Sequence, residues 1–153
     1  MDSAEYLAET LDIGPGTEVF EVACGAGEFL VPLHDNGFIV GGLDADPALV
    51  AKARTAMPAG HFTTGFLTEL DPTQPWQVVV CRAFGSFPDV DYARGVLARM
   101  AAKATHAVAI LAVPEARFDR RWLLHAFAEI GVSAVQMENV AGDEAHLNVF
   151  ARL

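Results

Sequence analysis

The apolar run at residues 17–23 ends in the turn Cys24-Gly25-Ala26-Gly27, and this junction constrains the fold more than any other part of the sequence. Glycines at such a junction let the backbone turn tightly and approach a ligand closely. A helical pattern at 28–35 follows, and its first turn would present free N–H groups to that ligand. A second apolar run at 38–43 then ends in Asp44. Strand, helix and strand in this order predict a parallel pair joined by a right-handed crossover.

The rest of the chain continues the alternation of strands and helices. Asp46 and Pro47 are typical of a helix start, because an aspartate caps the helix and proline needs no hydrogen-bond acceptor there. Further helices are predicted at 3–11, from Asp46-Pro47 to 57, from Asp89 or Asp91 to 103, and at 118–130. Further strands are predicted at 61–64, 76–82, 107–113, 132–140 and 146–152, with a loop at 65–75 and a hairpin turn at 141–144. The pattern therefore predicts an α/β fold with a mostly parallel seven-stranded sheet and an antiparallel strand from the C-terminal hairpin.

Length, charge and composition exclude several classes of protein. The 153 residues predict one domain spanning 1–153. The formal net charge is −10 and no basic run occurs, so no nucleic-acid partner is expected. No apolar run approaches the ~20 residues of a membrane span and no signal peptide is recognised, so we expect no membrane partner and a cytoplasmic location. The two cysteines and five scattered histidines indicate neither a disulfide framework nor a metal site.

Two cofactor classes share a glycine turn followed by an acid at the end of the second strand. A dinucleotide site requires G-x-G-x-x-G, in which the third glycine lets the helix pack closely on the strand. Counted from Gly25, that third position is Leu30. Glu28 would also oppose a pyrophosphate at the start of the helix. An NAD(P)-dependent oxidoreductase is therefore the less favoured alternative.

The segments Glu21-Val22-Ala23-Cys24-Gly25-Ala26-Gly27 and Asp44-Ala45-Asp46-Pro47 resemble the two nucleotide-binding motifs of class I S-adenosylmethionine (SAM)-dependent methyltransferases. The order of elements and the closing hairpin resemble that family over nearly the whole chain. The resemblance implies a Rossmann-like three-layer sandwich with strand order 3-2-1-4-5-7-6. It also implies SAM as the cofactor and S-adenosylhomocysteine (SAH) as the product.

The resemblance assigns roles to residues along the predicted edge of the sheet. The turn from Glu21 to Gly27 would face the methionine part of the cofactor, and Glu21 would orient its ammonium group. Asp44 would hold the ribose, and Ala45 would lie along the adenine. The expected cofactor-binding residues are Glu21, Ala23, Cys24, Gly25, Gly27, Asp44, Ala45, Phe66, Leu67, Cys81 and Arg82.

Two positions depart from the family pattern. Ala23 replaces its first glycine, and Phe66 stands where an acid usually accepts a hydrogen bond from the adenine amino group. Structural roles also remain open for the glycine turn in any α/β protein, for Asp44 as a helix cap, and for Glu21 and Arg82 as partners of nearby charges. Both cysteines are interpreted as small buried residues rather than reactive thiols.

Acceptor binding and catalysis are less defined by the sequence. Phe84, Ser86 and Phe87 follow the fourth strand and either line a substrate pocket or close the sheet edge, while Tyr6 on the first helix could cover the cofactor. No base stands out, and the candidates are Asp89, Asp91, Glu115 and His125.

Three functions follow from this interpretation. The first is methyl transfer to a small molecule, in a biosynthetic pathway of secondary metabolism. The second is a non-methylating reaction such as a cyclisation, or binding of SAM or SAH without turnover. The third is the oxidoreductase. Because no substrate-lid insertion is evident, we also expect a second subunit of a homodimer to cover the pocket.

Overall fold

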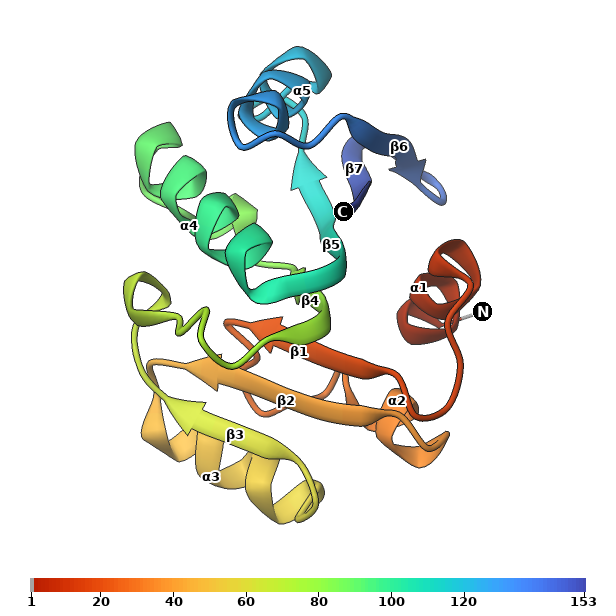
Figure 1. The fold of residues 1–153 in the computed structure, drawn as a ribbon, viewed down its shortest axis with the longest axis vertical. Coiled ribbons are helices and arrows are strands. Elements are labelled where there is room, and N and C mark those ends of the chain that lie inside the picture. The colour runs from red at the N-terminus through yellow and green to blue at the C-terminus, as the bar shows by residue number, and fades with distance from the viewer. Residues whose placement is uncertain (1) are drawn as a thin grey trace.

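A seven-stranded sheet runs through the middle of the molecule, with helices on both of its faces (Figure 1). The computed structural model describes residues 2–153. The helices are α1 (Ser3–Leu11), α2 (Val31–Asp35), α3 (Pro47–Ala56), α4 (Val90–Lys103) and α5 (Arg120–Glu129), with short 3-10 turns η1 (Leu67–Glu69) and η2 (Phe84–Ser86). The strands are β1 (Glu18–Val22), β2 (Ile39–Asp44), β3 (His61–Thr64), β4 (Trp76–Cys81), β5 (Ala104–Pro114), β6 (Ala134–Val140) and β7 (Asp143–Arg152).

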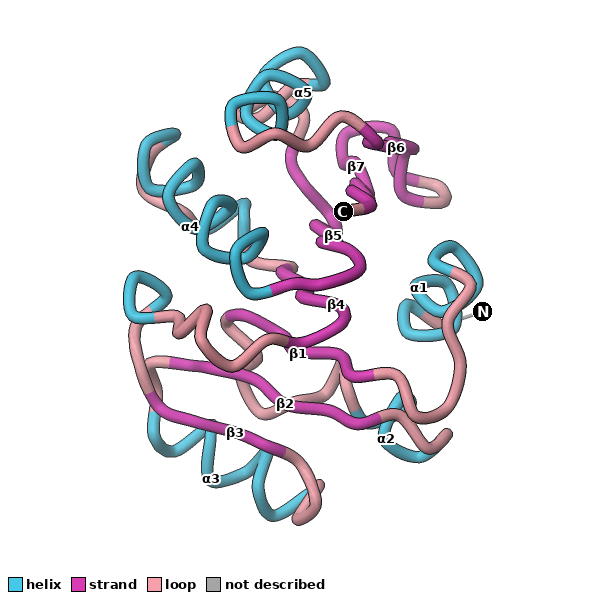
Figure 2. Tube along the Cα trace, in the orientation of Figure 1, coloured by secondary structure: helices cyan, strands magenta, loops and turns pink. Residues whose placement is uncertain are grey.

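The order of the strands is β3-β2-β1-β4-β5-β7-β6, as the resemblance implied. The pairs β3–β2, β2–β1, β1–β4 and β4–β5 are parallel, whereas β7 is antiparallel to both β5 and β6. Strand order reverses between β1 and β4, and ligands of open α/β sheets bind beside such a reversal at the carboxyl ends of the strands. Figure 2, coloured by secondary structure, shows how strands and helices alternate along the chain.

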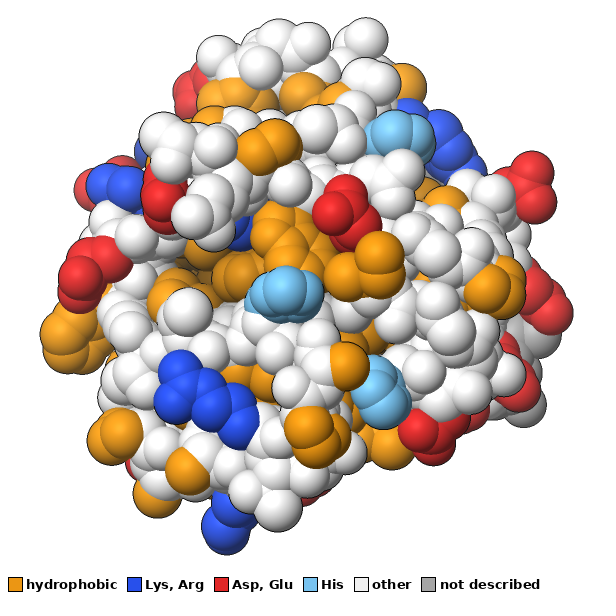
Figure 3. Space-filling view, turned by 60° about the horizontal axis from the view of Figure 1, so that its bottom comes forward, with side chains coloured by type: hydrophobic (Ala, Val, Ile, Leu, Met, Phe, Trp, Pro, Cys, Tyr) orange, Lys and Arg blue, Asp and Glu red, His pale blue; other side chains and the backbone are white. Residues whose placement is uncertain are grey.

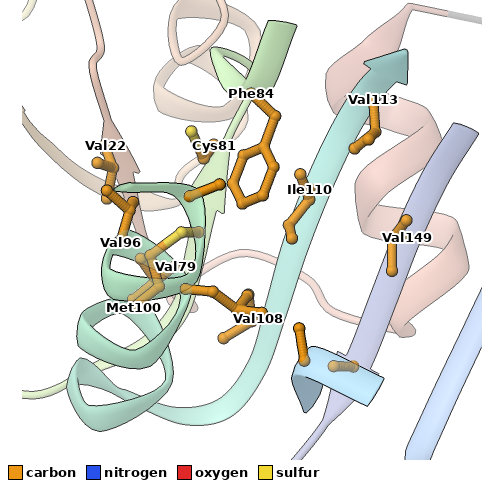
Figure 4. Packing of buried hydrophobic residues seen from close by; sticks show 14 of the residues in the cluster. Val22, Val79, Cys81, Phe84, Val96, Met100, Val108, Ile110, Val113 and Val149 are labelled. Carbon is orange, nitrogen blue, oxygen red and sulfur yellow. The ribbon is translucent and has the colours of Figure 1, made fainter. Parts of the chain in front are cut away.

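The side chains of β4 pack against helices on both faces of the sheet. Successive side chains of a strand point to opposite faces. Val79 and Cys81 lie in a hydrophobic core with α4 and α5, whereas Val78 and Val80 lie in a second core with α1, α2 and α3. Figure 4 shows the first core, in which side chains of α4 meet those of β4 and β5. The continuous apolar run of β4 thus corresponds to a strand buried on both faces.

Helix α2 differs from the prediction. It begins at Val31, not at residue 28, and residues between Cys24 and Leu30 form successive turns. The Leu30 N–H donates to the Gly27 carbonyl, which closes a turn at residues 28–30, and Pro32 occupies the first helical turn, where its missing N–H is not needed. The predicted start of this helix is therefore wrong by three residues, and a turn at residues 28–30 lies between the glycine turn and α2.

Other boundaries moved by a few residues for local reasons. Helix α3 begins as predicted, with Asp46 accepting a hydrogen bond from the Ala48 N–H. Helix α5 begins two residues late because Asp119 caps it, accepting from the Trp122 N–H. The hairpin between β6 and β7 is tighter than predicted, and Gly142 supplies its positive φ of +75°.

The crossover between β3 and β4 contains only the short turn η1, in agreement with the predicted loop at 65–75. The face of the sheet beside it carries a hollow of about 540 Å³, lined in part by Phe20, His61, Trp76 and Lys103. Figure 3 shows a hollow with a hydrophobic floor next to a histidine. Lys103 is held there by hydrogen bonds from its Nζ to the carbonyls of Asp71 and Gln74.

Two features are absent from residues 2–153. None of the helices is long and apolar enough to cross a membrane. No group of three or more His, Cys, Asp or Glu side chains is arranged to hold a metal ion in that range.

Candidate cofactor site

The glycine turn is held against the end of β2 by backbone hydrogen bonds. The Cys24 N–H donates to the Leu43 carbonyl at 3.0 Å, and the Gly25 N–H donates to Asp44 Oδ2 at 2.8 Å. A Cβ added to Gly25 would meet no atom within 4 Å, so the backbone at this point borders open space. Ala23 has a φ of +60°, a strained value for a residue with a side chain, and such strain gathers at ligand sites.

Asp44 remains able to accept further hydrogen bonds. Its Oδ2 accepts from Gly25 and its Oδ1 accepts from the Asp46 N–H at 2.9 Å. A carboxylate has about four acceptor sites, so about two remain for other donors such as ribose hydroxyls. Asp46, not Asp44, caps α3, which answers one of the structural alternatives left open by the sequence.

Glu21 lies near the carboxyl end of β1, and its side chain is completely buried. Its Oε2 accepts a hydrogen bond from Arg82 Nε at 2.7 Å, whereas its Oε1 has no hydrogen-bond partner among the described residues. Burial raises the pKa of Glu21 to about 7, against the opposing effect of Arg82. The sequence left open whether Glu21 pairs locally or serves a ligand. The structure shows the local pair through Oε2 and no partner for Oε1 among the described residues.

Arg82 is shared between this carboxylate and an aromatic ring. Its guanidinium lies 4.8 Å from the centre of the Phe29 ring, a cation–π arrangement. Arg82, Phe29 and Glu28 line a small pocket of about 240 Å³ together with the start of α1. Phe29 was missed at the sequence level, although an aromatic residue directly after a glycine turn is a usable signal.

The expected adenine side of the site carries an exposed aromatic ring. The Gly65 N–H donates to the Asp44 carbonyl at 3.0 Å, which holds the following segment beside β2. Phe66 is 64% exposed, an unusual state for a large hydrophobic side chain, and Ala45 is exposed as well. Leu67 is buried in the core, so its side chain does not face solvent there.

Three other expected cofactor-binding residues pack inside the protein. A Cβ on Gly27 would lie 2.6 Å from Met57 Cε and 3.2 Å from Ala53 Cβ, so this glycine allows α3 to approach the turn. The thiols of Cys24 and Cys81 are buried, and burial raises the pKa of each to about 12. Because both thiols are buried and Gly27 has no side chain, these three residues can meet a ligand only through their backbone.

The aromatic residues after β4 close the sheet edge. Phe84 and Phe87 are buried, with ring centres 4.9 Å apart, and Phe84 also packs edge-on against Phe118. Ser86 is exposed, and its hydroxyl donates to the Ala83 carbonyl. Of the two roles left open by the sequence, closure of the sheet edge agrees with the burial of both rings in the core with α4 and α5, and lining of a substrate pocket does not.

The residues considered as bases are engaged elsewhere. Asp89 caps α4 by accepting from the Tyr92 N–H, and Asp91 pairs with Arg94. Glu115 pairs with Arg120 at 3.3 Å, and His125 lies on the exposed face of α5, 3.5 Å from Glu129. The structure does not bring these four side chains together.

Tyr6 does not cover the glycine turn. Its hydroxyl donates to Glu138 on β6, and its ring packs edge-on against Phe150. No local pattern indicates this contact, because 132 residues separate Tyr6 from Glu138.

Comparison with known proteins agrees with this geometry. Residues 19–105 match the family model described as a methyltransferase domain, which spans the glycine turn, Asp44 and strands β1 to β4. An uncharacterised methyltransferase from Synechocystis is 36% identical over 62 residues. That alignment covers 40% of this chain and 29% of the relative.

Solved methyltransferase structures share the fold over almost the whole chain. An amino pentose methyltransferase of calicheamicin biosynthesis from Micromonospora echinaspora, solved with SAM bound, superposes with a TM-score of 0.81 and 18% identity. The match covers 99% of this chain and 91% of that one. A TehB-like SAM-dependent methyltransferase from Corynebacterium glutamicum gives a TM-score of 0.76 at 17% identity, covering 97% and 86%. The chain therefore belongs to the methyltransferase domain family of class I enzymes, whose cofactor is S-adenosylmethionine.

Proposed function

We propose that this chain transfers the methyl group of SAM to a small molecule. The observation that carries the proposal is the Glu21 carboxylate, which is fully buried at the glycine turn with one oxygen lacking a partner among residues 2–153. An unsatisfied buried acceptor is costly unless a ligand donor completes it. The ammonium group of a bound amino-acid tail is a donor of the required kind.

The remaining residues of the edge fit the rest of the cofactor. Asp44 keeps acceptor sites for the ribose hydroxyls, and the open space beside Gly25 leaves room for the backbone to approach. Phe66 offers an exposed ring on which an adenine can lie, in place of the missing acid. When bound, SAM supplies an electrophilic methyl group on a sulfonium centre.

The protein would contribute mainly position and electrostatics. Arg82 holds Glu21 in place through its Nε, and Phe29 holds the guanidinium from the other side. Fixing two reactants in line is a large part of the catalysis available to such a site. A small-molecule acceptor fits the acidic surface, since a net charge of −10 opposes a nucleic-acid backbone.

A second function is favoured by one observation. Asp89, Glu115 and His125 are all engaged in caps or ion pairs away from the glycine turn. If the site has no positioned base, methyl transfer requires an acceptor that reacts without one. The same arrangement suits a non-methylating reaction such as a cyclisation, or SAM binding without turnover. Release of SAH from SAM in the presence of acceptors, followed by mass spectrometry, separates methyl transfer from the other two.

Titration calorimetry with SAM, SAH, NAD and NADP tests the cofactor assignment. The proposal expects binding of both adenosyl ligands and none of the dinucleotides. Failure of SAM and SAH to bind to folded protein would overturn it, and binding of NAD or NADP alone would favour the oxidoreductase.

We further propose several properties of the whole protein that its sequence predicts. They are a single domain without a lid insertion, a role in secondary metabolism, a cytoplasmic location, no nucleic-acid partner and a homodimer that covers the open edge. Light scattering at micromolar concentration tests the homodimer, which a purely monomeric mass would contradict.

A further inference from the structure

A cavity of about 300 Å³ lies between the start of α1 and the β6–β7 hairpin. Its polar lining consists of Asp2, Tyr6, Glu138, Asn139 and Asn148. These residues come from both ends of the chain, and the fold brings them together on one side of the sheet. The volume is at the lower limit for pockets that hold small organic ligands, about 300–1,000 Å³.

A tyrosine–carboxylate pair forms one wall of the cavity. The Tyr6 hydroxyl donates to Glu138, while the ring packs edge-on against Phe150 with their centres 5.7 Å apart. Burial and the nearby Glu138 charge raise the pKa of Tyr6, so the phenol stays protonated and continues to donate. Glu138 is itself exposed to the cavity and to solvent, so its carboxylate has further acceptor sites for a ligand.

Both asparagines of the lining are fixed by contacts outside the cavity. Asn148 is 8% exposed, and its Oδ1 accepts from the Ala112 N–H at 3.0 Å. Ala112 has a φ of +56° where β5 and β7 lose register, a bulge of the kind found beside active sites. Asn139 donates to the carbonyls of Glu144 and His146. The polar walls are therefore in place before any ligand binds.

The charge of the lining is one-sided. Asp2 and Glu138 contribute carboxylates, and no basic side chain occurs among the lining residues that the structure describes. The nearby Arg120 is engaged with Glu115 and Asn139, and Arg152 with Gln136 and the Thr10 carbonyl. Such a cavity attracts a cation and repels an anion.

The cavity shares one lining residue with the small pocket beside Arg82. Asp2 lines both this cavity and the small pocket that contains Phe29 and Arg82. Arg82 is in turn bonded to Glu21 at the end of β1. A molecule seated against Tyr6 and Glu138 would thus lie beside the groups assigned to SAM.

We propose that this cavity binds the ammonium group of the methyl acceptor, with Glu138 and Asp2 as the anionic partners and Tyr6 holding Glu138 in place. The role of this amine as methyl acceptor rests on the proposed function, whereas amine binding itself can be measured without methyl transfer. The class of ligand is a small organic amine that is cationic at neutral pH.

Benzylamine, benzyl alcohol and benzoate are probes of similar size that differ in charge. We expect ligand-observed NMR or calorimetry on the whole chain, with and without saturating SAH, to show benzylamine binding at least 10-fold more tightly than benzyl alcohol, with benzoate not binding. Glu138→Gln should weaken benzylamine at least 10-fold, which is the scale of a charged hydrogen bond. Glu144→Gln, which removes the same charge from the same hairpin outside the lining, should leave it unchanged.

Equal binding of benzylamine and benzyl alcohol would overturn the proposal, as would equal effects of Glu138→Gln and Glu144→Gln. Glu138 is exposed, so its substitution does not threaten the fold. SAH binding distinguishes the two proposals. Amine binding without SAH binding would support the amine site and overturn the cofactor assignment. SAH binding without selectivity for the amine would overturn the amine site alone.

Discussion

Gly25 donates its backbone N–H to Asp44 Oδ2 at 2.8 Å, which joins the glycine turn to the carboxyl end of β2. One carboxylate thus organises the turn and still keeps acceptor sites for a ligand. The helix predicted to begin at residue 28 begins only at Val31, after a turn.

Replacing Asp44 should separate cofactor binding from helix capping. We expect Asp44→Ala to weaken SAH by about 1–3 kcal/mol, because hydrogen bonds to a charged group are lost. Asp46→Ala removes a carboxylate two residues away and should cost about 1 kcal/mol of unfolding free energy through the cap of α3, with little effect on SAH. Calorimetry and urea denaturation of both variants measure these effects. Equal SAH affinity in the two variants would remove Asp44 from the site.

The two glycines of the turn should respond differently to alanine. Gly25→Ala meets only backbone strain, about 1–2 kcal/mol of unfolding free energy, but places a methyl group in the open space assigned to the cofactor. Gly27→Ala adds close contacts with Ala53 and Met57, so we expect a loss of about 2–4 kcal/mol. SAH affinity should fall more in Gly25→Ala, although that variant is the more stable. A greater loss of SAH affinity in Gly27→Ala would contradict the placement of the cofactor beside Gly25.

The exposed ring of Phe66 should matter for binding and not for folding. Phe66→Ala is expected to change the free energy of unfolding by less than about 0.5 kcal/mol, as is usual for exposed positions. The loss of stacking should weaken SAH by about 1–3 kcal/mol. Leu124→Ala, at a 50% exposed position on α5, is the control and should change neither quantity. Unaltered SAH affinity in Phe66→Ala would place the adenine elsewhere.

The raised pKa of Glu21 predicts how stability changes with pH. Burial moves this pKa from 4.5 to about 7, so the folded protein holds more protons than the unfolded chain between these values. Raising the pH through this window should therefore lower the free energy of unfolding, by about 3 kcal/mol for this group. Urea denaturation should show that Glu21→Gln loses this component, while Glu9→Gln on the exposed side of α1 keeps it. A Glu21→Gln variant with the wild-type pH dependence would refute the buried-charge account.

Local signals explain why so much of the fold was predictable. Asp46-Pro47 marked the start of α3, and the β-branched run Val78-Val79-Val80 marked β4. The strand order came from the resemblance, because hydrophobic periodicity does not report which strands pair. Pro32 was the neglected local signal, since a proline in the first turn fixes where α2 begins.

Long-range contacts explain what could not be predicted. The sequence placed Glu21 and Arg82 at one sheet edge but could not give the bond between them, which joins residues 61 apart. Tyr6 and Glu138 meet only because β6 folds back beside β7 and α1 packs across the sheet. The burial of Phe84 likewise depends on Phe118, which follows β5. Such pairings depend on tertiary packing, which no local pattern encodes.

The most direct test of the central claim is the proton balance of SAH binding. If the free oxygen of Glu21 receives the ammonium group of the ligand, binding must favour the ionised carboxylate and lower its pKa from about 7. Calorimetry near pH 6.5 in two buffers of different ionisation enthalpy should then show release of a fraction of a proton by the wild type. Glu21→Gln should bind SAH more weakly and release none. SAH binding with no proton release, or with equal release by the Glu21→Gln variant, would contradict the assignment of this carboxylate to the cofactor.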